Sequence, residues 1–149
     1  MCQAHHYVSG MPYDPVLVQP MREDLTTVGI SELETEEAVD QFMTDKSGTS
    51  MIVINSVCGC AAGSARPGIK MALRHHVLPD RVATVFAGQD LDATARFRSY
   101  VPHIPPSSPA VALFRDGELV YIYPRHQIEG RPPQEIASDL IEAFDEHLS

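Results

Sequence analysis

The sequence has no apolar run near the length of a membrane span and no N-terminal stretch that resembles a secretory signal. A transmembrane helix needs about 20 consecutive apolar residues. Residues 1–10 also lack the basic start and the long apolar core of a signal peptide. These absences predict a soluble protein that does not associate with membranes and that lies in the cytoplasm, where disulfides are usually transient and catalytic.

Basic residues are scarce in this chain. It has 11 Lys and Arg against 20 Asp and Glu, which gives a formal net charge of −9. Sequence-independent binding of nucleic acid depends on Lys and Arg that displace counterions from phosphates. Nucleic acid is therefore not expected among the partners.

No internal repeat and no long linker divides the sequence. Its 149 residues, 44% of them hydrophobic, are enough for a single core. We expect one domain over residues 14–149 and a flexible tail over residues 1–13, because chain ends are poorly ordered unless they are held. Cys2, His5 and His6 lie in this tail, and a loose metal-binding or redox role for them stays open.

Two cysteines one residue apart are the most informative pattern present. Cys58 and Cys60 follow the short β-branched run 51–54, which is typical of a strand buried on both faces, and they precede a helix-like segment. Free N–H groups at a helix N-terminus stabilise an anion. The pKa of a cysteine there falls from about 8.5 to roughly 3.5–7.5. The pattern predicts a redox centre that works through a thiolate.

Gly59 is the residue expected to bend the chain between the two thiols. A disulfide between residues i and i+2 needs a bent backbone, and glycine accepts conformations, including positive φ, that other residues avoid. A bridge between Cys58 and Cys60 is therefore feasible but strained, and so easily reduced. We expect the pair to work mostly as a dithiol or as a mixed disulfide.

Two other interpretations of the cysteine pair remain open. The pair could be half of a thiolate metal site, although such sites usually take four ligands and the third cysteine, Cys2, is far away in sequence. The thiols could also be buried and inert, since free cysteine is often buried. No metal site is predicted.

Carboxylates are absent between Ser47 and Pro79, although the chain as a whole is acidic. A thiolate at the start of this segment is spared like-charge repulsion, and nearby cations lower its pKa. Arg66 is the cation expected near enough to act on it. The other cations are expected at the far end of the following helix, where they complement the helix dipole: Lys70, Arg74, His75 and His76.

The remaining pattern alternates between strand-like and helix-like segments. Strands are expected at residues 51–55, 81–86, 110–114 and 118–123, the last two joined by a hairpin at Asp116-Gly117. Helices are expected to start at Pro20, at Ser31 with Glu34 as a capping box, near Cys60, at Asp90 and after Pro133. The helix from Cys60 should reach Val77 and bend at Pro67.

This order, βαβαββα with extra N-terminal helices, matches an α/β fold of the thioredoxin-like kind, with a central mixed sheet and flanking helices. From about Asp14 to the last helix the chain also resembles the bacilliredoxins, thioredoxin-like proteins with a CxC active site. The blocks that carry the resemblance are residues 55–63, 65–67, 84–90, 106–109, 124–126 and 128–130.

The resemblance implies a thiol–disulfide oxidoreductase that removes bacillithiol, a small anionic thiol, from protein mixed disulfides. Cys58 would be the attacking thiolate and Cys60 the resolving thiol. The implied partners are bacillithiolated or otherwise oxidised proteins, a low-molecular-weight thiol and a thiol–disulfide reductase, with bacillithiol as co-substrate and no bound cofactor. Disulfide isomerisation, or a thiolate metal-binding module, are the alternatives.

The resemblance also implies where the substrate binds. It puts Ser108-Pro109 at the cis-proline position beside the cysteines, and the candidate substrate-binding residues are Gly59, Arg66, Ser108 and Pro109. His126 and Glu129 could line the site or cap the last helix, and the sequence leaves both possibilities open.

Overall fold

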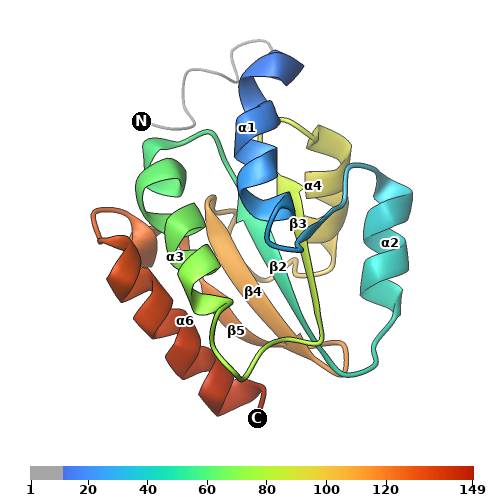
Figure 1. Cartoon of the computed structure of the whole chain (residues 1–149). Helices are drawn as coiled ribbons and strands as arrows, with labels where there is room; N and C mark the ends of the chain where they lie inside the picture. The colour runs from blue at the N-terminus through green and yellow to red at the C-terminus, as the bar shows by residue number, and fades with distance from the viewer. Residues whose placement is uncertain (1–11) are drawn as a thin grey trace.

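The computed structural model describes residues 12–149 of the chain (Figure 1). Cys2, His5 and His6, and most of the expected tail, lie outside the described residues. The strands are β1 (Ser31–Glu32), β2 (Thr49–Asn55), β3 (Arg81–Phe86), β4 (Ala110–Arg115) and β5 (Glu118–Tyr123). The helices are α1 (Pro15–Thr26), α2 (Glu36–Thr44), η2 (Ala61–Ala65), α3 (Arg66–Ala72), α4 (Leu91–Ser99), α5 (Arg125–Ile128) and α6 (Pro133–His147).

A five-stranded sheet in the order β1-β3-β2-β4-β5 forms the centre of the fold. Strand β2 pairs parallel with β3 and antiparallel with β4, and β4 pairs antiparallel with β5. The expected mixed sheet is therefore confirmed. Strand β2 lies in the middle, so chemistry placed at its end is held by neighbours on both sides.

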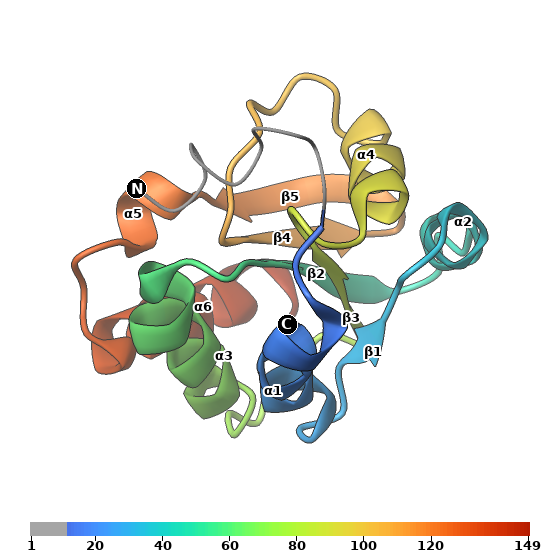
Figure 2. The same cartoon turned by 90° about the horizontal axis from the view of Figure 1, so that it is seen from above.

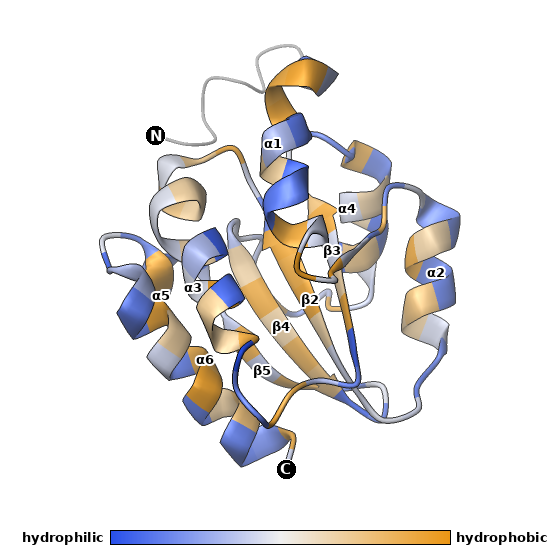
Figure 3. Ribbon diagram, in the orientation of Figure 1, coloured by the Kyte–Doolittle hydropathy of each residue, from blue (hydrophilic) through white to orange (hydrophobic). Residues whose placement is uncertain are grey.

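Helices cover both faces of the sheet (Figure 2). Alternate residues of β2 serve the two layers, because side chains of a strand point to opposite faces. Met51 and Val53 pack into the core beneath α1, α3 and α6, whereas Ile52 and Ile54 pack into the core beneath α2 and α4. Every residue of β2 is buried, and Figure 3 shows the central strands as the most hydrophobic part of the ribbon.

Most of the expected elements are confirmed. Strand β3 and the hairpin of β4 and β5 occupy the predicted residues to within one position. Helices α4 and α6 begin where Asp90 and Pro133 indicate. Among the helices of residues 12–149, none is long and apolar enough to cross a membrane.

The predicted starts of the two N-terminal helices are wrong. Helix α1 begins at Pro15 after Asp14, whose side chain accepts a hydrogen bond from the Val16 N–H, so Pro20 lies inside the helix. Ser31 does not cap a helix, because it belongs to strand β1. Thr35 caps α2 instead, with its Oγ1 accepting from the Ala38 N–H at 3.1 Å.

The helix after β2 also differs from its prediction. It ends at Ala72 and not near Val77, and its first part, η2, is a π-helical turn in which the Arg66 N–H donates to the Ala61 carbonyl. Pro67 has no N–H to continue an α-helical pattern from Gly63. The wider π turn therefore stands where the sequence predicts a bend, and π turns and prolines are both known sources of helix bends.

Candidate active site

The two cysteines lie where β2 gives way to the helical segment. The Cys58 carbonyl accepts hydrogen bonds from the N–H groups of Ala61 at 2.9 Å and Ala62 at 3.1 Å. A residue whose carbonyl accepts the first bonds of a helix occupies its N-cap, where the unpaired N–H groups of the first turn gather. Cys58 therefore stands at the position that favours a thiolate.

The sulfur atoms of the two cysteines are in contact. The Sγ atoms of Cys58 and Cys60 lie 2.7 Å apart. Cys58 is 3% exposed, whereas Cys60 is partly exposed. The proximity predicted from the sequence is present, and Cys60 is the more exposed of the two residues.

Gly59 does not bend the chain in the way the sequence suggests. It is helical, and it is not among the glycines that have positive φ. The helix begins at once after Cys58, so the two sulfurs approach within its first turn without a left-handed residue between them.

The peptide bond between Ser108 and Pro109 is cis. Ile54, near the end of β2, pairs with Ala110 at the start of β4. Because the strands are antiparallel, the residues just before β4 lie at the end of the sheet from which β2 continues to Cys58. Ser108 is buried at this end. The cis bond implied by the resemblance is therefore present, at the end of the sheet from which β2 leads to Cys58.

Arg66 is buried, with 3% of its surface exposed. Its Nη1 donates to the Ser56 carbonyl at 2.7 Å and to Asn55 Oδ1 at 3.0 Å. Its Nε donates to Asp24 Oδ2 at 3.1 Å. The guanidinium is therefore directed at the backbone before Cys58 and at helix α1.

Residues 47–79 contain no carboxylate, but a carboxylate from helix α1 lies against this segment in the folded protein. Asp24 of α1 pairs with Arg66 and, at 3.2 Å, with Lys70. Burial acts to raise the pKa of the Asp24 carboxyl, but the hydrogen bonds from Lys70 and Arg66 outweigh it and lower this pKa. Burial lowers the pKa of Arg66, and Asp24 opposes that effect. The positive charge of Arg66, which the sequence predicts to act on the thiolate, is therefore paired with a carboxylate.

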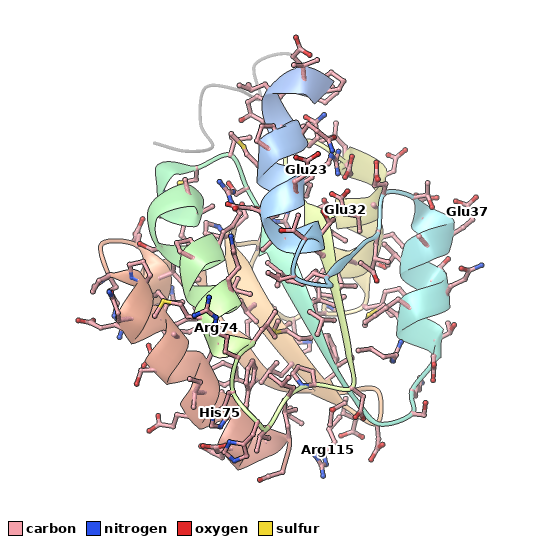
Figure 4. The ribbon with its side chains drawn as sticks, viewed as in Figure 1. Glu23, Glu32, Glu37, Arg74, His75 and Arg115 are labelled. Atoms are coloured by element: carbon pink, nitrogen blue, oxygen red, sulfur yellow. The ribbon has the colours of Figure 1, made fainter. Side chains whose placement is uncertain are left out.

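The remaining cations lie away from the cysteines. Figure 4 shows Arg74 and His75 at the end of α3 that is far from the start of η2. His75 Nε2 lies 2.8 Å from Asp145 Oδ1 of α6. These side chains belong to the end of the helical segment, as the sequence predicts.

A cavity of about 520 Å³ opens between the loop before the cis proline and the chain after β5. It is lined by Ile104, Pro105, Pro106, Ser107, Ile122, Pro124, Arg125, His126 and Glu129. The Arg125 N–H donates to Ser107 Oγ at 2.7 Å, which joins the two walls. His126 and Glu129 therefore line this cavity, whereas α6 begins at Pro133, after the N-cap residue Pro132, without a side-chain cap.

Comparison with known proteins agrees with this geometry. The family model described as disulphide isomerase matches residues 13–148. The chain is 55% identical over 139 residues to a bacilliredoxin of Salinibacter ruber, covering 91% of this chain and 81% of that protein. A bacilliredoxin of Cytophaga hutchinsonii is 54% identical over 134 residues, which is 90% of this chain and 98% of the relative. The chain belongs to the bacilliredoxin family.

The fold of this bacilliredoxin-family chain also has a solved counterpart. A structure with a thioredoxin fold covers 76% of this chain and 92% of its own, with a TM-score of 0.58 and 16% sequence identity. This likeness shows a thioredoxin-like fold, and membership of the bacilliredoxin family makes the chain a thiol oxidoreductase.

Three residues near the cysteines of this bacilliredoxin-family chain were not predicted from the sequence: Asn55, Ser56 and Asp24. Asn55 and Ser56 lie in a block that carries the resemblance, so a signal for them was present. Asp24 had no such signal, because 42 positions separate it from Arg66. Within residues 12–149 there is no group of three or more His, Cys, Asp or Glu side chains that could hold a metal.

Proposed function

We propose that this protein removes bacillithiol from mixed disulfides on oxidised proteins in the cytoplasm. The observation that carries the proposal is the contact of the Cys58 and Cys60 sulfurs, 2.7 Å apart, at the start of a helix. Family membership adds to this support, since the relatives are bacilliredoxins. A helix start stabilises the thiolate that exchange requires.

In the first step the Cys58 thiolate attacks the bacillithiol sulfur of the mixed disulfide. A new disulfide forms between Cys58 and bacillithiol as the old disulfide breaks, and the protein cysteine leaves as a thiolate that takes a proton from water. The protein substrate is reduced and leaves. Bacillithiol remains on Cys58.

A second thiol clears this adduct. Cys60 is well situated, because its sulfur contacts Cys58. Its attack on the Cys58 sulfur forms a Cys58–Cys60 disulfide and releases bacillithiol, after which a thiol–disulfide reductase supplies two electrons. A free bacillithiol can act instead, which yields bacillithiol disulfide and restores the Cys58 thiolate.

Disulfide isomerisation is the second candidate. The family model that matches residues 13–148 is described as disulphide isomerase, and the same pair of thiols would serve that reaction. An isomerase rearranges protein disulfides without net reduction. Consumption of reducing equivalents therefore separates the two functions.

The test compares one protein substrate that carries bacillithiol with the same protein carrying glutathione. Reduced enzyme is mixed with each, and mass spectrometry follows the released substrate thiol and the mass added to Cys58. We expect faster release from the bacillithiolated substrate and a bacillithiol adduct at Cys58. Scrambled ribonuclease serves as the isomerase substrate. Its reactivation, with no release of bacillithiol from the first substrate, would contradict the proposal.

A further inference from the structure

The turn between β2 and Cys58 is held by three hydrogen bonds on one residue. Ser56 accepts from Arg66 through its carbonyl at 2.7 Å and donates its N–H to Asn55 Oδ1 at 2.9 Å. Its Oγ accepts the Cys58 N–H at 3.1 Å. Any shift of Ser56 is therefore passed to the backbone of Cys58.

Helix α1 holds the two side chains that hold Ser56. Asn55 Nδ2 donates to the Met21 carbonyl at 3.2 Å, and Arg66 Nε donates to Asp24 at 3.1 Å. Figures 1 and 2 show α1 next to α3. Helix α1, which is not part of the βαβαββα order, is thus linked through the side chains of Asn55 and Arg66 to the turn that leads to Cys58.

The arrangement suits a positioning role better than a purely electrostatic one. The planar guanidinium reaches a carboxylate with Nε and a carbonyl with Nη1 at the same time, which a lysine ammonium cannot reproduce. The charge of Arg66 is opposed by Asp24 at 3.1 Å, which weakens the field that Arg66 alone would produce. A buried charge with a single carboxylate partner also depends strongly on that partner.

We propose that Arg66 and Asp24 are a positioning pair for Cys58: Arg66 fixes the Ser56 carbonyl, Asp24 fixes Arg66, and helix α1 thereby sets the reactivity of the thiol. This inference rests on the proposed role of Cys58 as the attacking thiol. When the turn shifts, Cys58 loses its alignment with the N–H groups of the first helical turn, and its thiolate becomes less stable.

The experiment measures alkylation of Cys58 by iodoacetamide in the reduced full-length protein, from about pH 5 to about pH 9, with fragment-ion mass spectrometry to separate Cys58 from Cys60. Arg66→Gln should slow alkylation near neutral pH about tenfold and raise the apparent pKa, since small misplacements of reacting groups cost this much or more. Arg66→Lys should be slowed similarly, because it keeps the charge but not the geometry.

Two control variants distinguish a specific effect of Arg66 on Cys58 from the general effect of losing an ion pair. Lys70→Gln removes the other cation on Asp24 and should stay within about twofold of the native rate. Arg96→Gln breaks a similar ion pair with Asp40 and Glu36, between α4 and α2, and should do the same. All rates are measured below the unfolding transition of each variant.

The alkylation rates of the Arg66 variants decide whether Arg66 positions Cys58. A native rate and pH profile in Arg66→Lys would show that charge acts alone, and native profiles in both Arg66 variants would show a merely structural role; either overturns the proposal. If the Arg66 variants do not fold, Asp24→Asn decides instead. About threefold slowing supports the proposal, and a native rate overturns it. Because alkylation needs no bacillithiol, failure of the wild type to release bacillithiol would count against the proposed function and not against this pair.

Discussion

The helical segment after β2 has two unlike halves. In η2, a Cβ added to Gly63 would find no atom of residues 12–149 within 4 Å apart from its chain neighbours and the backbone of its own helix. In α3, a Cβ added to Gly68 would lie 2.6 Å from Ile136 Cβ of α6, and Ile69 is fully buried. The half that starts at the cysteines is open at Gly63, although its Ala61 and Ala65 are buried, whereas the other half packs closely against α6 at Gly68.

Residues Arg66 and Pro67 form the junction between η2 and α3, and they allow the two kinds of helix to follow each other directly. Arg66 ends the π turn through its N–H bond to the Ala61 carbonyl, and Pro67 follows at once. Since Pro67 donates no hydrogen bond, the α-helical pattern of α3 does not have to continue backward into η2. The hydrogen-bond pattern of the segment therefore changes at Arg66, where η2 ends and α3 begins.

The largest effect is expected when the thiols at the start of the helical segment, Cys58 and Cys60, are replaced one at a time. Cys58→Ser should abolish release of bacillithiol from a mixed disulfide, because a hydroxyl does not act as the exchanging nucleophile. Cys60→Ala should keep the first step and trap the adduct on Cys58. Quenched-reaction mass spectrometry measures both. Loss of the first step in Cys60→Ala, with Cys58→Ser still active, would reverse the assignment; the greater exposure of Cys60 makes this comparison decisive.

The second test disturbs the close contact between Gly68 of α3 and Ile136 of α6. Gly68→Ala should lower the free energy of unfolding by about 1–3 kcal/mol, the usual cost of an extra group in a packed core. The new Cβ meets Ile136 and also the Pro133 carbonyl at 3.0 Å. Urea unfolding measures the loss, while Cys58 alkylation in the folded variant should stay within about twofold of native. An unchanged unfolding midpoint would remove the contrast between the halves.

Local signals in the sequence were enough for much of the fold. Strand β3 and the hairpin follow from runs of strand-forming residues and from Asp116-Gly117, both readable within a few positions. The cysteine pair follows equally from local spacing. The cis bond before Pro109 came from the family resemblance, because an X-Pro sequence alone favours trans.

Non-local pairing accounts for what the sequence did not reveal. Strand β1 consists of only two residues that pair with Ala83 and Thr84 of β3, so Ser31 looked like a helix cap. The carboxylate partner of Arg66 was not foreseen for the same reason, since Asp24 and Arg66 are 42 positions apart in the sequence. Spacing identifies the reactive atoms, but tertiary contacts decide what surrounds them.

A third test asks how much the ion pair at the junction adds to stability. The pKa of Asp24 is lowered in the folded protein, so its contribution is present above the pKa of the unfolded state, about 3.9, and is lost as the pH falls through the folded pKa. Asp24→Asn should therefore have a lower urea midpoint than the native protein near pH 7, with a gap that closes in acid. The side chain is 40% exposed, so the gap should be modest. A gap that does not change with pH would assign the effect to packing.

The smallest expected effect comes from Gly63→Ala in the first half. Alanine avoids the entropic cost of ordering a glycine in a helix, and Gly63 has no positive φ that would oppose the change. With no described atom within 4 Å of the new Cβ, the free energy of unfolding should rise by about 0.5–1 kcal/mol. Urea unfolding beside Gly68→Ala makes the matched pair. A loss of about 1 kcal/mol or more would mean that the π turn cannot accept a side chain at Gly63, and the first half would then be as tightly constrained as the second.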